Sequence, residues 1–137
     1  MSSKASERSA ILAILPPVAA TNARTSAYVD MGKYGSGRVT VLTGDNSSTG
    51  TITLLRANSS TGGSSQSVAT ATYGGASSTN DDTAVVLNIL ESDIDDDPDR
   101  PYYAFAFDTV ALSAGMIEGI DPRYGPPTQG TAVTIAR

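Results

Sequence analysis

The carboxylates of one short acidic segment, Asp93–Asp99, are the side chains best suited to chemistry. Five of its seven residues are aspartates, and closely spaced oxygen ligands suit a hard cation such as Ca²⁺. An EF-hand loop counted from Asp93 fails, because Pro98 occupies the glycine position and Ala104 the position of the bidentate glutamate. Since runs of charge usually lie in solvent, we expect a solvated acidic turn and assign no metal ligand.

A pair of carboxylates can also act as the acid and nucleophile of a glycosidase, and Glu91, Asp93 and Glu118 are the possible members. Such a pair must lie about 5–10 Å apart across a cleft, and the chain has no Trp to form a sugar platform. The chain also lacks His and Cys, which excludes Ser-His-Asp and Cys-His mechanisms and thiolate metal sites. We therefore expect no enzyme, no catalytic residue and no cofactor.

The glycine-rich segment Gly32–Gly37 is not expected to bind phosphate. A P-loop places its Lys after the second Gly of a longer spacing, whereas Lys33 follows the first Gly here. The segment is predicted to form a tight turn between strands.

Charge and hydropathy restrict the possible partners. The net charge is −5 and the pI is about 4.4, so the surface repels phosphate backbones and nucleic acid is not an expected partner. No run of eighteen apolar residues exists, so we expect no transmembrane helix. A cleaved secretory leader is not expected either, because Pro16 and Pro17 interrupt the short apolar run Ala10–Leu15.

The elements that position these residues are predicted to be short strands. Ala, Gly, Ser and Thr fill 64 of the 137 positions, a composition that suits strands and turns better than long helices. The predicted strands are Ser26–Met31, Arg38–Thr43, Thr51–Arg56, Ser67–Tyr73, Thr83–Leu90, an aromatic strand over Tyr103–Phe107, Val110–Ile120 and a short edge strand over Thr131–Ile135. This spacing predicts an all-β, antiparallel β-sandwich that is jelly-roll-like, with an immunoglobulin-type sandwich as the alternative.

Three predictions concern burial. Tyr103, Phe105 and Phe107 alternate with small residues, so we expect them on the inner face of a strand, in the core. The continuous apolar residues of Thr83–Leu90 predict either a strand buried on both faces or a strand that crosses between sheets. Ala57–Ser65 is expected to be a flexible polar loop at the surface.

The first 24 residues are predicted to form an extended N-terminal docking arm, and residues 25–137 the sandwich domain. Ala5–Leu15 fits either a short helix or a strand, and Pro16-Pro17 ends it in both cases. An arm with an Ile/Leu cluster needs a surface to lie on, either its own domain or a neighbouring subunit. Arg and Tyr near the end of the chain are favoured at interfaces. The candidate partner-interface residues are Ile11, Leu12, Ile14, Leu15, Tyr102, Arg123 and Tyr124.

A set of short motifs resembles a known class of protein. Tyr28–Met31 (Tyr-Val-Asp-Met), Arg38–Val41 (Arg-Val-Thr-Val), a late aromatic strand and Gly119–Pro126 (Gly-Ile-Asp-Pro-Arg-Tyr-Gly-Pro) follow an N-terminal Ile-Leu-x-Ile segment, Ile11–Ile14. In this order they resemble the small capsid decoration, or cement, proteins encoded among the head genes of tailed bacteriophages. The acidic segment and the long Ser/Thr/Gly loops are outside the resemblance.

The resemblance implies a virion structural protein on the outer surface of an icosahedral capsid, a homo-trimer that bridges subunits of the major capsid protein. The alternative is a receptor- or carbohydrate-binding module that uses the loops Gly44–Gly50, Ala57–Ser65 and Gly74–Asp82. Those loops lack the aromatic and charged side chains that usually supply binding energy. A head–tail joining or tail structural subunit is a third possibility.

Overall fold

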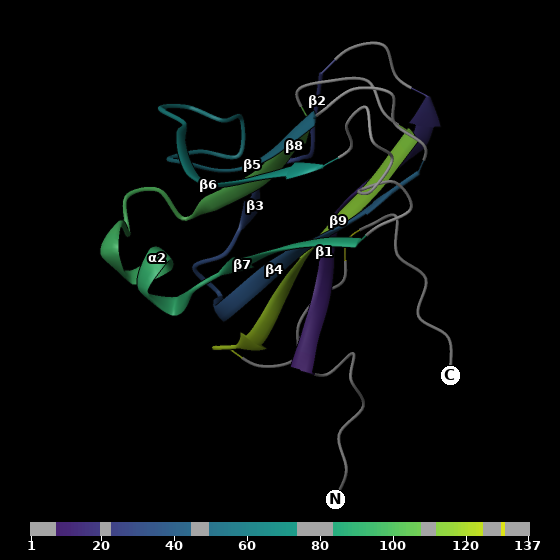
Figure 1. The fold of residues 1–137 in the computed structure, drawn as a ribbon. Helices are drawn as coiled ribbons and strands as arrows, with labels where there is room; N and C mark the ends of the chain where they lie inside the picture. The colour runs from purple at the N-terminus through teal and green to yellow at the C-terminus, as the bar shows by residue number, and fades with distance from the viewer. Residues whose placement is uncertain are drawn as a thin grey trace, which may run out of the picture.

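The computed structural model describes residues 8–19, 23–44, 50–73, 84–107, 112–124 and 130, which form two packed antiparallel sheets (Figure 1). Sheet A contains, in order across the sheet, β1 (Ser9–Ala19), β9 (Leu112–Pro122), β4 (Tyr34–Thr43) and β7 (Ala84–Ile89). Sheet B contains β2 (Arg24–Thr25), β8 (Tyr102–Phe107), β5 (Gly50–Ala57) and β6 (Gln66–Tyr73), and β3 (Val29–Asp30) also pairs with β8.

The strand pairs are nested, which is the topology of a jelly roll. β1 pairs with β9 in sheet A, β2 and β3 pair with β8 in sheet B, β4 pairs with β7 in sheet A, and β5 pairs with β6 in sheet B. The chain is thus one long antiparallel hairpin whose successive strand pairs belong to alternate sheets. The prediction of an all-β, jelly-roll-like sandwich is confirmed.

The boundary drawn at residue 24 needs correction, because strand β1 is part of the sandwich. Ser9–Ala19 forms the edge of sheet A and pairs with β9 from Ser9 opposite Ile120 to Ala19 opposite Leu112. Of the two surfaces proposed for the arm, this part of it lies on its own domain. Residues 1–7 and 20–22 are outside the described part of the chain.

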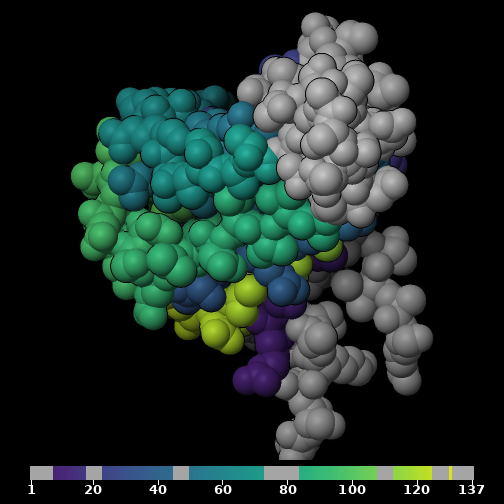
Figure 2. All heavy atoms as spheres, in the orientation of Figure 1, coloured from purple at the N-terminus to yellow at the C-terminus, as the bar shows by residue number. Residues whose placement is uncertain are grey.

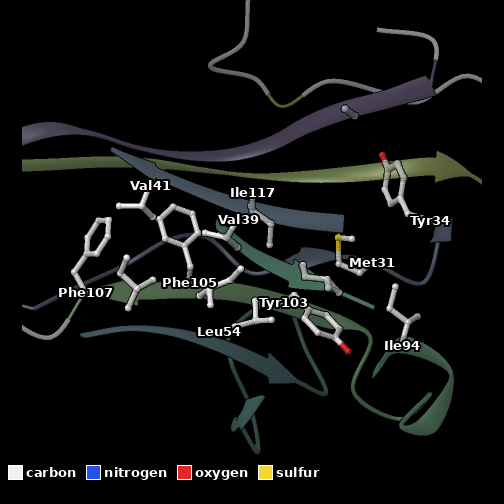
Figure 3. Close-up of a cluster of buried hydrophobic side chains, with 14 residues drawn as sticks. Met31, Tyr34, Val39, Val41, Leu54, Ile94, Tyr103, Phe105, Phe107 and Ile117 are labelled. Atoms are coloured by element: carbon white, nitrogen blue, oxygen red, sulfur yellow. The ribbon is translucent and has the colours of Figure 1, made fainter. Parts of the chain in front are cut away.

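The core lies between the sheets and contains the three aromatic residues predicted for it. Tyr103, Phe105 and Phe107 from β8 are at most 1% exposed, and the two Phe rings meet edge to face with centroids 5.7 Å apart. They face Val39, Val41 and Ile117 from sheet A (Figure 3). The alternation of residues along β8 therefore correctly predicted that its largest side chains lie in the core.

Strand β7 is buried on one face only, contrary to the sequence-based expectation. Leu87 and Ile89 are buried, whereas Val86 is 51% exposed and Leu90, after the strand, 54% exposed. The reason is its position: β7 is the other edge of sheet A, and the outer face of that sheet has no covering layer within the described residues.

Two predicted loops are more ordered than expected. The acidic turn contains a six-residue helix, α2 (Glu91–Asp96), and Ile94 of this helix is buried at one end of the core. Between β5 and β6, the backbone N–H of Asn58 donates to Gly63, and an added Cβ at Gly62 would lie 2.7 Å from the Tyr28 ring. The connection is therefore a hydrogen-bonded turn that packs on Tyr28.

Several predicted segments lie outside the described residues. They are the edge strand Thr131–Ile135, the loop Gly74–Asp82, and residues 45–49 of the loop Gly44–Gly50. No helix in the described ranges has the length and apolar character that crossing a membrane requires.

Candidate partner interface

Arg123 and Tyr124 follow the last strand, and the structure gives them different roles. The backbone N–H of Arg123 donates to the carbonyl of Lys33, and its guanidinium lies 3.1 Å from Asp95 and 3.9 Å from Glu91. Arg123 therefore binds helix α2 of its own chain. Tyr124 is 81% exposed and is free to contact a partner.

Helix α2 is held by arginines from three separate parts of the chain. Arg123 approaches after β9, while Arg56 from β5 lies 3.6 Å from Asp97 and Arg100, before β8, lies 2.9 Å from it. Arg100 also donates to the carbonyl of Ser64. Figure 2 shows the result, with the β5–β6 connection in teal and α2 with the following residues in green forming one continuous surface.

The three carboxylates considered for a glycosidase pair all have structural partners. Asp93 accepts a hydrogen bond from the backbone N–H of Leu90 and so caps the first turn of α2, Glu91 contacts Arg123, and Glu118 pairs with Arg38. Within the described residues, no three His, Cys, Asp or Glu side chains form a group that could hold a metal ion. The acidic segment is thus a structural element, and three arginines of the same chain pair with some of its carboxylates.

Beneath α2, the hydroxyl of Tyr103 lies in a buried, charged environment. Burial raises the pKa of this tyrosine, the nearby Arg56 lowers it, and Asp93 and Asp97 raise it further. Neither the Tyr103 hydroxyl nor Nε of Arg56 has a hydrogen-bond partner in the described structure. This arrangement favours the neutral phenol and offers no exposed group for chemistry.

The four candidate residues of β1 point to different sides of sheet A. Leu12 and Leu15 pack against the core, whereas Ile14 is 40% exposed and pairs with Met116, which is on the outer side of β9. The carbonyl of Ile11 accepts a hydrogen bond from the N–H of Gly130. Because Leu12 and Leu15 pack against the core, Ile11 and Ile14 are the two of these four β1 residues that remain candidates for an external contact.

Tyr102 lies on a third surface. Because Tyr103 points into the core, Tyr102 is on the outer side of sheet B, where it is half-buried. The seven candidate residues are therefore divided among the core, the outer faces of both sheets and the segment after β9. They do not form one interface.

The outer face of sheet A carries exposed apolar side chains, of which sequence analysis selected Ile14 but not Leu42 or Val86. One row across the sheet contains Ile14, Met116, Thr40 and Val86, and the next contains Ala114, Leu42 and Ala84. Leu42 is 62% exposed and Val86 51% exposed. In Arg38–Thr43, Thr40 and Leu42 alternate with Val39 and Val41, and this strand period is the signal that indicates an outward leucine.

The third row of this face contains an ion pair. Nε of Arg38 lies 3.3 Å from Glu118, and the arginine side chain is 50% exposed while the glutamate side chain is 10% exposed. Arg38 partly covers the carboxylate, so the guanidinium is the member of this ion pair that mainly contacts solvent.

The outer face of sheet B differs in chemistry. Its central residues are threonines and alanines, with Thr53 paired to Thr70 on β6 and to Ala106 on β8, and Thr51 paired to Thr72. Exposed large apolar side chains therefore gather on the outer face of sheet A, while the rows around Thr51 and Thr53 on the outer face of sheet B contain small side chains.

Comparison with known proteins shows the fold and no more. No family model matches the chain, and no match to a curated protein was found. The crystal structure of PBSX exported protein XepA is similar, with a TM-score of 0.52 and 12% sequence identity. The alignment covers 100% of this chain and 45% of XepA, so the chain spans less than half of that protein.

Proposed function

We propose that this chain is a phage virion structural protein that binds the outside of an icosahedral capsid and bridges major capsid subunits as a homo-trimer. The observation that carries the proposal is a jelly-roll sandwich with large apolar side chains exposed on one sheet face. Exposed apolar patches on a folded domain are typical of protein-binding surfaces. The function is accordingly binding and mechanical support, without catalysis.

Two further observations support a phage context. The motifs from Ile11 to Pro126 resemble capsid decoration proteins, and the similar fold of XepA belongs to a phage-associated exported protein. Arg56, Arg100 and Arg123 pair with only part of the acidic charge of α2 and Asp97, and the exposed apolar side chains of sheet A offer a separate surface for a partner.

Reconstruction of intact particles tests this proposal. We expect density for the sandwich outside the capsid shell, at local three-fold positions, and its loss from particles made without this chain. Particles without the chain should release their DNA at a lower temperature than complete particles, because fewer contacts oppose separation of the subunits. Density on the tail, or binding of the isolated protein to glycans in place of heads, would contradict it.

A further inference from the structure

We infer that the outer face of sheet A is the surface that docks on the capsid, and that it recognises an apolar patch bordered by a carboxylate. This inference rests on the proposed function and adds which face is used. Leu42, Val86 and Ile14 are 40–62% exposed and lie in adjacent rows of one sheet. Burying each such side chain in an interface is favourable by about 1–2 kcal/mol.

Charge identifies the kind of partner. In the described rows of this face the charged side chains are Arg38 and Glu118, and the more exposed of the two is the cation. A partner that covers Arg38 without offering a carboxylate would remove part of its hydration without replacing it. A complementary surface therefore places Asp or Glu beside the apolar residues that meet Leu42 and Val86.

The same reasoning disfavours a second copy of this chain. A copy packed face to face would present the same rows, in which Glu118 is already occupied by its own Arg38. No other carboxylate is present in those rows for the opposing arginine. Two copies would thus bury two Arg38–Glu118 pairs, each of which loses hydration without gaining a new partner.

The small area of this face also disfavours a stable dimer of two copies. Three strand spacings of about 4.8 Å and five residues of about 3.4 Å give a footprint of roughly 14 by 17 Å. That footprint is well below the roughly 800 Å² per partner of a standard stable interface. One copy would bind weakly, and a trimer that docks three such faces would gain affinity through avidity.

Binding to capsids prepared without this chain tests the inference. The variant Leu42→Glu/Val86→Glu adds two negative charges to the outer face of sheet A, and Thr70→Glu/Thr72→Glu adds the same charge to exposed positions of β6 in sheet B. All four positions are outside the core, so both variants should keep the circular dichroism spectrum and melting temperature of the native protein. Co-sedimentation with the capsids measures binding.

We expect the sheet A variant to bind at least about tenfold more weakly than the native protein and the sheet B variant to bind normally. Equal binding by the sheet A variant, or loss of binding by the sheet B variant alone, would overturn the inference and leave the proposed function intact. Failure of the native protein to bind would overturn both. Analytical ultracentrifugation provides a further test. Self-association of the native protein that is abolished in Leu42→Glu/Val86→Glu would show that a second copy binds this face, and would overturn the inference.

Discussion

Gly119 has no space for a side chain, because the ring of Tyr34 packs directly on its Cα. An added Cβ would lie 2.6–2.7 Å from three carbons of that ring. At Gly35, one strand away, the nearest heavy atom to an added Cβ would be 3.5 Å away, an ordinary contact. Glycine is thus required at the first position for close packing between strand and ring.

We predict that Gly119→Ala lowers the free energy of unfolding by about 1–3 kcal/mol, since the Tyr34 ring must move out of a packed site. Gly35→Ala should change it by less than about 1 kcal/mol and serves as the matched control. Urea denaturation followed by tyrosine fluorescence measures both. Equal effects of the two substitutions would show that the contact with the ring is not the cause.

Burial raises the pKa of both Tyr34 and Tyr103 above the ordinary value of 10.0, and nearby carboxylates raise it further, from Asp30 for Tyr34 and from Asp93 and Asp97 for Tyr103. The folded state therefore favours the neutral phenols. The resulting stability is complete below pH 10.0 and is lost as the pH rises through the folded-state pKa values.

Tyr103→Phe separates this effect from packing. Because the hydroxyl of Tyr103 has no hydrogen-bond partner in the described structure, its removal should change stability at neutral pH by less than about 1 kcal/mol. Above pH 10.0 the variant should lose less stability than the native protein. Thermal melts across the alkaline range, with tyrosinate absorbance recorded in parallel, test this. An unchanged alkaline loss would contradict the assignment.

Helix α2 depends on side chains from outside its own six residues. A six-residue helix has little stability of its own, and this one is fixed by the buried Ile94 and by Arg56, Arg100 and Arg123. The acidic composition correctly indicated a surface segment. It did not indicate a helix, because the stabilising partners come from β5 and from the residues beside β8 and β9.

We predict that Asp97→Asn lowers the free energy of unfolding by about 1–2 kcal/mol, because it weakens the ion pairs with both Arg56 and Arg100. Asp96→Asn removes the same charge from the neighbouring exposed position, the last residue of α2, and should cost less than about 0.5 kcal/mol. Denaturant melts at low and high salt compare them, and the difference should shrink as salt rises. A larger effect at Asp96 would refute this account.

Arg24 makes contacts between the two sheets that no local sequence pattern indicated. From β2 in sheet B, it donates to the carbonyls of Pro16 in β1 and Ser113 in β9, and its guanidinium lies 5.3 Å from the centroid of the Phe107 ring. One side chain thus links the two sheets at one end of the sandwich. Sequence analysis had assigned Arg24 to a separate arm.

How far the sequence predicts the elements depends on whether their partners are local. The aromatic strand β8 was predicted because Tyr103, Phe105 and Phe107 alternate with small residues, and both faces of a strand are visible in such a pattern. β1 was not, because its Ile/Leu cluster fits a helix or a strand equally well. Only pairing with β9, about a hundred residues later, decides between them.

The exposed face of sheet A escaped prediction for a similar reason. Val85, Val86 and Leu87 are continuous apolar residues, which predicts burial on both sides of a strand. Val86 is nevertheless half exposed, because β7 is an edge strand and the described chain supplies no covering layer. If the docking inference is correct, the pattern indicated a burial that is completed by a partner protein.

For the whole molecule, the nested strand order places late segments between early ones. β9 lies between β1 and β4 in sheet A, and β8 lies between β2 and β5 in sheet B. Each sheet therefore has a strand from the last third of the chain in its interior. The sandwich is consequently closed by its C-terminal half and not by its N-terminal strands.

This order has a consequence for biosynthesis. While the ribosome is still translating the region before Tyr102, a nascent chain can pair β4 with β7 and β5 with β6, but both sheets lack an inner strand. Pairing of β1 with β9 must wait until Leu112–Pro122 has been made, and such distant pairings form slowly. During that interval the apolar strands stay open, so chaperone binding should be concentrated in the time between synthesis of β7 and synthesis of β9.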